Sequence, residues 1–257
     1  MPSLEFAGAT DVGRKRDHNE DALLVLPEHS LAVVCDGMGG HEAGEVASGI
    51  GVETVKRFFE LAHDPEATWP FRYDRSKDEG WNLLSVAAQW ANQRIREAGD
   101  NGNAPAGKRG MGTTFVGCLL RGDKAWFGWV GDSRGYVWRR GELHPTTSDH
   151  SLLNEMIRTG RLSGEEIENF QHKNVITRAL GMADQTEVDV NTWDLEPGDV
   201  CLVCCDGLTG MVPDQRIAEI LSGEKDLKAA CQRLVDEANQ AGGVDNITVA
   251  LVRYQPQ

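Results

Sequence analysis

The sequence has no apolar run long enough to cross a bilayer, and no apolar signal core follows its first methionine. Basic residues are also few. The 26 Lys and Arg residues stand against 40 Asp and Glu residues, which gives a formal net charge of -14. A chain with this charge should be repelled by nucleic acid and by anionic membrane surfaces. We therefore expect a cytoplasmic protein without a nucleic-acid or membrane partner.

The cysteines form no disulfide framework or zinc pattern. The six are Cys35, Cys118, Cys201, Cys204, Cys205 and Cys231. Most lie in apolar, strand-like runs, where cysteine usually acts as a small buried hydrophobe. Cys201 and Cys204 have a spacing found in zinc and redox sites, but no second Cys or His pair stands at matching spacing. Period-2 alternation within a strand explains this spacing better, and the cysteine pattern suits a reducing cytoplasm.

Apolar segments separated by glycine-containing turns are plentiful. The periodicity predicts strands over 4–9, 22–26, 31–35, 113–120, 124–130, 134–139, 186–193, 199–205 and 247–252. It predicts helices over 42–61, 81–98, 214–221 and 225–238. Strands follow strands, and the helices come mainly in two pairs. This order favours an α+β fold of antiparallel sheets covered by helices over an alternating parallel fold.

Three segments are expected to lie outside these elements. Residues 63–80 are rich in Pro, Trp and charge, and predict a loop that aromatic side chains pin to the body, with a partner surface as the alternative. The Gly- and Asn-rich segment 99–112 predicts a mobile linker. Residues 149–180 are polar and predict a surface flap. All 257 residues are compatible with a single domain, 1–257.

Several acidic residues stand at the ends of apolar strands. Asp36 and Asp206 each follow a buried strand and precede a glycine, within the similar segments VVCDGMGG and LVCCDGLTG. One such motif in each of two sheets would bring both Asp-Gly ends to the same edge of a sandwich. Glu20 and Asp21 stand before another strand. Asp132 follows a strand, and Asp245 precedes the final one.

Carboxylates in such positions are half-buried, and burial is costly unless the group is paired or bound to a metal. The nearby basic residues are too few to pair all of them. Carboxylate and backbone carbonyl oxygens suit Mg²⁺ or Mn²⁺, and a glycine after each aspartate lets the backbone approach closely. A single Asp-Gly is more often an ordinary turn. Several strand-end acids in one chain together predict a divalent-metal site.

The ordered motifs resemble those of the type 2C metal-dependent protein phosphatases, particularly the compact bacterial members. The matching blocks are DVGRKRDHNED (11–21), VVCDGMGGHEAGEVAS (33–48), GMGTT (110–114), VGDSRGY (130–136), TSDHSLL (147–153), NVITRALG (174–181), CCDGLTGM (204–211) and GGVDNITV (242–249). The resemblance implies two antiparallel sheets packed as a sandwich between antiparallel helix pairs (α-β-β-α), with a small flap. It also implies hydrolysis of phosphoserine and phosphothreonine in proteins, with two or three Mn²⁺ or Mg²⁺ ions.

The resemblance assigns roles to individual residues. The implied metal-site residues are Glu20, Asp21, Asp36, Gly37, Asp132, Asp206 and Asp245. Asp36 would bridge two metals, and Gly37 would add a ligand through its carbonyl. Glu20 and Asp21 would orient metal-bound water, whereas Asp132 would help to hold a third ion. Arg16 would grip the substrate phosphate while a hydroxide that bridges the metals attacks phosphorus.

The acid that protonates the leaving group is less well defined. Many family members have a histidine directly after the first Asp-Gly, but this chain has Met38 there. His41 lies nearby and can take over this catalytic role. Alternatively, a metal-bound water does so, and His41 only caps the following helix or contacts solvent.

Two other functional classes remain open at this point. An inactive relative would keep the fold and bind a phosphoprotein, although the intact ligand positions argue against it. A metal-dependent phosphodiesterase would usually mix histidine with carboxylate, whereas the ligand set matched here contains no histidine. We expect the partners to be phosphorylated proteins, the targets of a serine/threonine kinase. We expect the protein itself to be a monomer.

Overall fold

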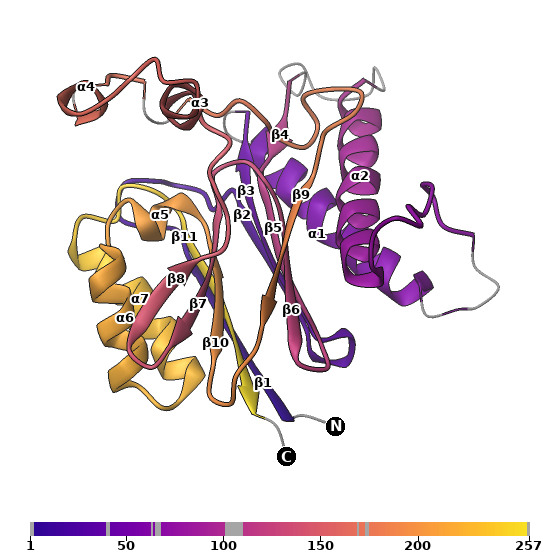
Figure 1. Cartoon of the computed structure of the whole chain (residues 1–257). Coiled ribbons are helices and arrows are strands. Elements are labelled where there is room, and N and C mark those ends of the chain that lie inside the picture. The colour runs from indigo at the N-terminus through magenta and orange to yellow at the C-terminus, as the bar shows by residue number, and fades with distance from the viewer. Residues whose placement is uncertain are drawn as a thin grey trace.

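The computed structural model describes residues 3–39, 42–62, 64, 68–100, 110–168, 170–172 and 175–255. Its strands form two antiparallel sheets (Figure 1). The first sheet has the order β1 (Ser3–Asp11), β11 (Ile247–Gln255), β10 (Val200–Cys204), β7 (Arg134–Arg139) and β8 (Glu142–Pro145). The second has the order β2 (Asp21–Leu26), β3 (Leu31–Met38), β5 (Phe115–Arg121), β6 (Lys124–Val130) and β9 (Asp189–Asp194), and β4 (Gly112–Thr113) pairs with β3.

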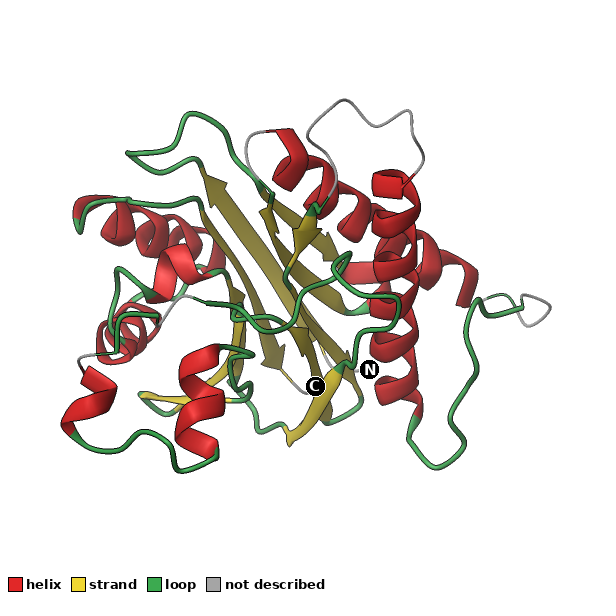
Figure 2. Cartoon of the chain, turned by 90° about the horizontal axis from the view of Figure 1, so that it is seen from above, coloured by secondary structure: helices red, strands yellow, loops and turns green. Residues whose placement is uncertain are grey.

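Helix pairs cover the outer faces of both sheets, so the layers run helix, sheet, sheet, helix (Figure 2). Helices α1 (Glu42–Ala62) and α2 (Glu79–Asp100) pack on the second sheet. Helices α6 (Asp214–Gly223) and α7 (Leu227–Gln240) pack on the first. The shorter helices are η1 (Pro27–His29), α3 (Leu152–Arg158), α4 (Glu165–Glu168) and α5 (Asp206–Thr209). The predicted α-β-β-α sandwich is confirmed.

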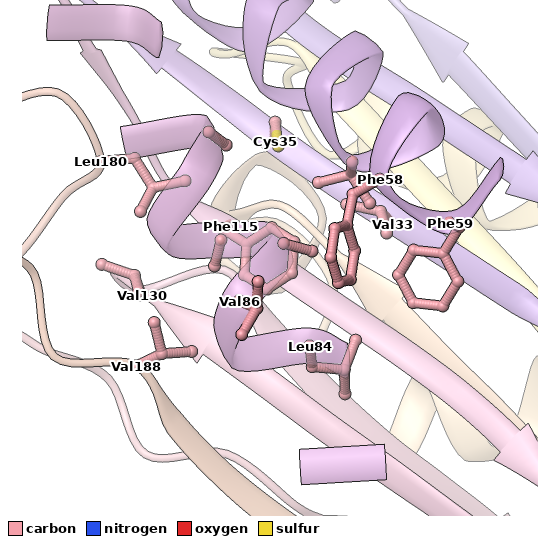
Figure 3. Close-up of a cluster of buried hydrophobic side chains, with 14 of the residues drawn as sticks. Val33, Cys35, Phe58, Phe59, Leu84, Val86, Phe115, Val130, Leu180 and Val188 are labelled. Atoms are coloured by element: carbon pink, nitrogen blue, oxygen red, sulfur yellow. The ribbon is translucent and has the colours of Figure 1, made fainter. Parts of the chain in front are cut away.

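Alternation along the central strands divides apolar side chains between the two faces of a sheet. In β3, Leu31, Val33 and Cys35 face the helices, whereas Ala32 and Val34 face the opposite sheet. Figure 3 shows the helix-side cluster, where β3, β5 and β6 meet α1 and α2. Because both faces of these strands are covered, they appear in the sequence as continuous apolar runs.

The predicted elements are present, but some of their limits differ. The predicted strand 31–35 continues to Met38, because Gly37 and Met38 pair with β4. The predicted strand 113–120 is divided between β4 and β5, because the Thr114 N–H turns aside to donate to the Asp36 carbonyl. The edge strand β8 was not predicted from the sequence.

The segments outside the core follow the sequence in part. Trp69 packs edge-on against Phe58, with ring centroids 5.1 Å apart, which agrees with a loop pinned by aromatics. Residues 63 and 65–67 of this loop and residues 101–109 of the linker lie outside the described residues. In the predicted flap, α3 and α4 project beyond the ends of the sheets (Figure 1).

The six cysteines are all free and buried, as expected for small core residues. Alternation explains the Cys201–Cys204 spacing, because Cys204 faces α6 and α7 whereas Cys201 faces the opposite sheet. Among the described residues, no helix is both long and apolar enough to span a membrane.

Candidate active site

The two Asp-Gly motifs meet at one edge of the sandwich, as their similarity predicts. Asp36 lies in β3 in phase with Ala32, so alternation directs its carboxylate toward the opposite sheet. Asp206 begins α5, and only Cys205 separates it from the end of β10 in the first sheet. Both residues line a cavity of about 490 Å³ that Asp132 and Asp245 also line. Acids from both sheets therefore converge at this cavity.

Asp21 lies beside Asp36, and the pair is unfavourable without a cation. The two residues are direct cross-strand neighbours in the antiparallel β2–β3 pair. Like charges in this relationship repel each other. Both carboxylate oxygens of Asp21 are buried and have no hydrogen-bond partner among the described residues. One oxygen from each aspartate and the Cys205 sulfur lie within 4.8 Å of one another.

Burial raises the pKa of the clustered carboxyls. It is the main reason that the pKa of Asp36 lies well above its ordinary value, and the charges of the neighbouring acids raise it further. Burial likewise raises the pKa of Asp21 to about 6. It raises the pKa of Asp132 to about 7, with a further contribution from the charge of Asp206. A group of acids that resists ionisation in this way is suited to hold positive charge.

Close packing of the backbone explains the glycines of both Asp-Gly motifs. A Cβ atom on Gly37 would lie 2.2 Å from the carbonyl oxygen of Gly44 and 2.4 Å from that of Glu20. A Cβ atom on Gly207 would lie 1.9 Å from the carbonyl oxygen of Asn246. Any side chain at either position would force the segments around the cavity apart.

The threonines of the GMGTT block hold the backbone of Asp36. The Thr113 hydroxyl donates to the Asp36 carbonyl at 2.8 Å, and the Asp36 N–H donates to the Thr114 hydroxyl at 2.9 Å. The Thr114 hydroxyl is also 2.7 Å from the Ser133 hydroxyl. Thr114 therefore connects the chain at Asp36 with the chain next to Asp132.

Asn246 fixes the N-terminal loop that carries Arg16 and Glu20. Its side-chain amide donates to the carbonyl oxygens of Val12 and His18, each at 2.9 Å. Its side-chain oxygen accepts from the Glu20 N–H at 2.8 Å. Asn246 is buried, with 4% of its surface exposed. One side chain thus satisfies three backbone groups of a loop that lies more than 200 positions earlier in the chain.

Arg16 lies at the mouth of the cavity. Its Nη2 atom is 2.8 Å from Oδ2 of Asp245, and its side chain remains 46% exposed. Lys15 also lines the cavity, although the resemblance singled out only Arg16. A guanidinium in this position can turn toward an anion that enters the cavity, because its planar fork offers several donors.

Most of the predicted site residues are brought together. Those that line the cavity are Arg16, Glu20, Asp36, Gly37, Asp132, Asp206 and Asp245. Asp21 lies against Asp36 without lining the cavity. Met38 and the flap residue Ile176 contribute to the cavity wall. His41 lies outside the described residues.

The sequence interpretation missed three supporting residues. Asn246, Cys205 and Thr114 were not among the predicted site residues. For Asn246 and Cys205 the available signal was their position beside the predicted ligands Asp245 and Asp206, because a polar or small residue beside a ligand can orient it.

The residues present fit divalent cations. Asp21 has two buried oxygens without hydrogen-bond partners, and Asp132 has one, among the described residues. The clustered donors are carboxylate oxygens, the ligand type that Mg²⁺ and Mn²⁺ prefer. The Cys205 thiol lies next to them, but it donates to the Asn246 carbonyl at 3.3 Å and accepts from the Thr248 N–H at 3.1 Å. Burial raises its pKa well above the ordinary value.

Comparisons with known proteins show similarity over nearly the whole chain. Residues 8–247 match the family Protein phosphatase 2C. Protein phosphatase PhpP from Streptococcus pneumoniae is 36% identical over 252 residues, which cover 97% of both chains. The serine/threonine phosphatase structure from S. agalactiae is 37% identical, with a TM-score of 0.83 and coverage of 97% of this chain and 99% of that one.

The structure of the catalytic domain of the phosphatase PstP contains two manganese ions. It is 29% identical to this chain, has a TM-score of 0.80, and the match covers 99% of this chain and 100% of that one. Since sequence and structural similarity both extend over nearly the full length, this chain belongs to the protein phosphatase 2C family.

Proposed function

We propose that the acid-lined cavity is the active site of a metal-dependent protein phosphatase that hydrolyses phosphoserine and phosphothreonine. The observation that carries this proposal is the convergence of Asp36, Asp132, Asp206 and Asp245 on one cavity with Arg16 at its mouth. The acids provide a place for cations, and Arg16 provides a place for the phosphate. Membership of the phosphatase 2C family supports the same reaction.

The residues divide the work according to their positions. Asp36, Asp206 and Asp245, with the Gly37 carbonyl, would hold two Mn²⁺ or Mg²⁺ ions, and Asp132 would help to hold a third. Glu20 and Asp21 would orient water at the cations. When bound, such ions activate water for attack and neutralise charge on the phosphoryl oxygens. Arg16 would bind the phosphoryl oxygens through its planar fork, which orients the phosphorus for displacement.

The identity of the acid that protonates the leaving oxygen stays a prediction. His41 is the sequence-based candidate. Met38, which occupies the position of the family histidine, lines the cavity and cannot donate a proton. A comparison of His41→Ala with wild type on a phosphothreonine peptide decides the matter. Unaltered turnover in the variant would remove His41 from the mechanism.

We further propose that the substrates are proteins phosphorylated by a serine/threonine kinase, and that the enzyme acts as a monomeric signalling protein. The exposed cavity and its flap suit a phosphorylated segment that projects from a protein surface.

Six free cysteines suit a reducing compartment, which supports a cytoplasmic location. The two sheets and the helices α1, α2, α6 and α7 pack as one sandwich, which supports a single phosphatase domain over 1–257.

Phosphate release from a phosphothreonine peptide tests the proposed activity. We expect release with Mn²⁺ or Mg²⁺ and none in excess EDTA. Asp36→Asn and Asp206→Asn should each lower the rate by at least roughly a hundredfold, since loss of several kcal/mol of charge stabilisation has that effect. Arg94→Ala, on the exposed side of α2, is the matched charge-removing control and should remain active.

Two outcomes would contradict the proposal. Release that persists in EDTA would exclude the carboxylate cluster as the catalytic centre. Absence of release with either metal, in a protein that still binds the phosphopeptide, would favour an inactive phosphoprotein-binding relative. A bis-ester that is cleaved faster than the phosphopeptide would indicate a phosphodiesterase instead.

A further inference from the structure

His150 forms hydrogen bonds to the backbone of Gly131, the residue that precedes Asp132. Its ring Nδ1 accepts a hydrogen bond from the Gly131 N–H at 3.1 Å. Its backbone N–H donates to the Gly131 carbonyl at 2.9 Å. The imidazole also stacks on Trp129, with ring centroids 6.0 Å apart and an interplanar angle of 21°. Both hydrogen-bonding groups of the Gly131 backbone are therefore held by one residue.

The direction of the Asp132 carboxylate depends on this backbone. Its Oδ1 atom is buried and has no hydrogen-bond partner among the described residues. Gly131 has a φ of +110°, and a Cβ atom there would lie 2.7 Å from the Thr114 side chain. This conformation is available to glycine but strained for other residues. The hydrogen bonds from His150 hold the chain in it, directly before Asp132.

The Nε2 side of the imidazole faces Asp189 of β9 and the base of the flap, by which we mean the C-terminal end of the flap at Thr177 and Arg178. Because Nδ1 accepts from Gly131, the ring proton of the neutral imidazole lies on Nε2, which donates to Asp189 Oδ2 at 2.9 Å. Arg178, near the end of the flap, pairs with the same Asp189 carboxylate at 3.5 Å. The Thr177 N–H donates to the His150 carbonyl at 2.8 Å. Burial, and to a smaller extent the charge of Arg178, lower the pKa of His150.

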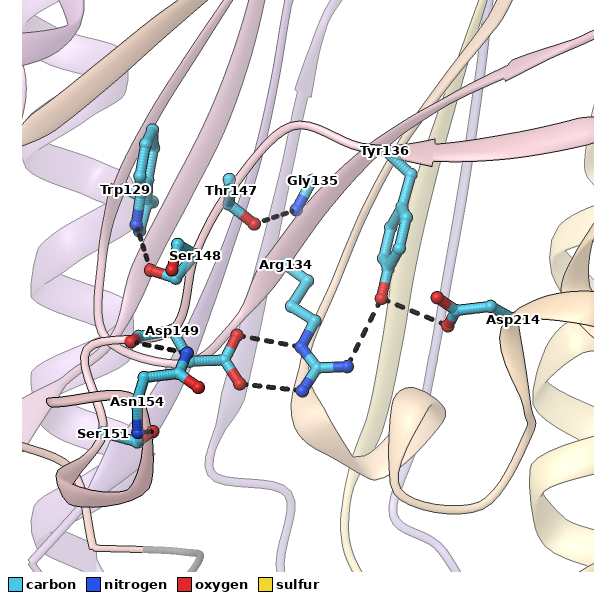
Figure 4. Close-up of polar contacts among 10 residues, drawn as sticks. All are labelled: Trp129, Arg134, Gly135, Tyr136, Thr147, Ser148, Asp149, Ser151, Asn154 and Asp214. Atoms are coloured by element: carbon cyan, nitrogen blue, oxygen red, sulfur yellow. Dashed lines mark hydrogen bonds and ion pairs between the residues drawn. The ribbon is translucent and has the colours of Figure 1, made fainter. Parts of the chain in front are cut away.

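The segment that carries His150 is itself anchored to β6 and β7 (Figure 4). Arg134 forms a two-pronged ion pair with Asp149, at 2.9 and 2.7 Å. The Trp129 indole N–H donates to the Ser148 carbonyl at 2.9 Å. These contacts leave His150 little freedom, because the residues on both sides of it are fixed. A movement of Thr177 and Arg178 would therefore displace the His150 ring and, with it, the backbone of Gly131.

We propose that His150 is a positioning residue, which sets the Asp132 carboxylate through Gly131 and couples it to the base of the flap. This inference rests on the proposed function, in which Asp132 helps to hold a cation. His150 touches neither the cavity nor the reacting atoms, so it acts only through its neighbours. Its contribution should appear in metal binding and in the rate constant more than in substrate affinity.

Two amide variants separate the roles of the ring nitrogens. In His150→Asn, the side-chain oxygen can stand near the position of Nδ1 and accept from the Gly131 N–H. In His150→Gln, the amide reaches the position of Nε2 and leaves Gly131 without its acceptor. We expect His150→Asn to keep at least half of the wild-type kcat and His150→Gln to lose about tenfold, with KM changed less than threefold. Equal rates in both variants would overturn the proposal.

Calorimetric titration with Mn²⁺ gives a readout that does not depend on turnover. We expect the weakest Mn²⁺ site to lose at least fivefold in affinity in His150→Gln and to stay within twofold of wild type in His150→Asn. His144→Phe is the matched control, because His144 forms a comparable ring pair with Trp193, 5.6 Å apart, away from the cavity. An unchanged weakest site in a folded His150→Gln protein would contradict the inference.

The Asp132→Asn background tests whether His150 acts through Asp132. If it does, His150→Gln should change kcat and Mn²⁺ binding less than twofold in that background. If the losses of kcat from the two substitutions multiply, His150 acts independently of Asp132 and the proposal is overturned.

Failure of the proposed function can be distinguished from failure of the positioning role. If wild type and His144→Phe hydrolyse no phosphopeptide while the Mn²⁺ titrations follow the expected pattern, the proposed function fails and the positioning role stands. If wild type and His144→Phe are active and the His150 variants have the same kcat and Mn²⁺ affinity as these two proteins, only the positioning role fails.

Discussion

The Arg16 guanidinium is paired with Asp245, with 2.8 Å between Nη2 and Oδ2. This pair joins the predicted phosphate-binding group to a predicted metal ligand. The charge of Arg16 also lowers the pKa of Asp206, although burial raises that pKa by more. Arg16 therefore competes with cations for the acids and favours phosphate binding at the same time.

Removal of Arg16 should consequently weaken phosphate binding without weakening cation binding. We expect Arg16→Ala to raise KM for a phosphothreonine peptide roughly ten- to hundredfold, because hydrogen bonds to charged groups contribute about 1.5–3 kcal/mol. The affinity for Mn²⁺ should stay the same or increase. Steady-state kinetics and calorimetric titration measure the two effects. Arg16→Lys keeps the charge but loses the planar fork, so its KM should lie between that of wild type and that of Arg16→Ala. Weaker Mn²⁺ binding in Arg16→Ala would show that the electrostatic argument is wrong.

Asn246→Ala should destabilise the N-terminal loop and the protein as a whole. The substitution removes three hydrogen bonds to backbone groups of Val12, His18 and Glu20. It should lower the free energy of unfolding by roughly 3 kcal/mol, at about 1 kcal/mol for each bond. Urea denaturation measures the change. Gln232→Ala is the matched control, because its amide donates to the side chain of Asp236 at the surface. If Asn246→Ala and Gln232→Ala had the same free energy of unfolding, the stabilising role assigned to the Asn246 hydrogen bonds would be wrong.

The metal-free protein should lose stability as pH rises from about 5 to about 7.5. The ordinary pKa of an aspartate here is 3.8, whereas burial raises that of Asp21 to about 6 and that of Asp132 to about 7. Because the folded state binds these protons more tightly than the unfolded state does, their stabilisation is complete below the unfolded pKa. It is lost as pH rises through the folded values.

Thermal unfolding in EDTA across this pH range measures the effect. Addition of Mn²⁺ should flatten the decline, since a bound cation compensates the ionised carboxylates. Asp132→Asn removes one titrating group and should reduce the slope, most clearly between about pH 6 and 7.5. A metal-free protein that becomes more stable over this interval would reverse the expected sign.

The ion pair between Arg139 and Asp199 should contribute more to stability than the surface pairs do. Asp199 is almost fully buried, and its carboxylate accepts two bonds from Arg139, at 2.9 and 2.6 Å. Asp199→Ala leaves a partly buried guanidinium without its main partner, which should cost about 3 kcal/mol. Arg94→Ala breaks an exposed pair with Glu97 and should cost less than about 1 kcal/mol. Chemical denaturation distinguishes the two. Equal losses would contradict the role assigned to burial.

Patterns along the chain predict antiparallel sheets covered by helices, and the family resemblance adds the order of the layers. The strand-end acids Asp36, Asp132, Asp206 and Asp245, which the same patterns single out, line one cavity. Asp36 and Asp206 are recognisable because each interrupts an apolar run and precedes a glycine. The strand β8 was missed because its sequence, Glu-Leu-His-Pro, has no sustained alternation and lies at a sheet edge, where charge and proline are common. Local periodicity carries little information about such a strand.

Long-range polar contacts were beyond sequence reasoning. Asn246 contacts the loop at Val12 and His18, and His150 contacts Gly131 and Asp189, across separations that no local pattern encodes. Such contacts depend on the docking of the two sheets and of the flap base. Their residue types, an ordinary asparagine and an ordinary histidine, are too common in surface positions to identify their roles in advance.

The acids of the cavity also fix when the site can form during synthesis. Asp36 leaves the ribosome well before Asp245 and β11 do. A growing chain that has made its first sheet partners but lacks β11 holds neither Asp245 nor the Asn246 clasp on the Arg16 loop. Catalytic competence should therefore arise only once β11 has been made, and chains that lack β11 should leave the phosphoproteins around them untouched.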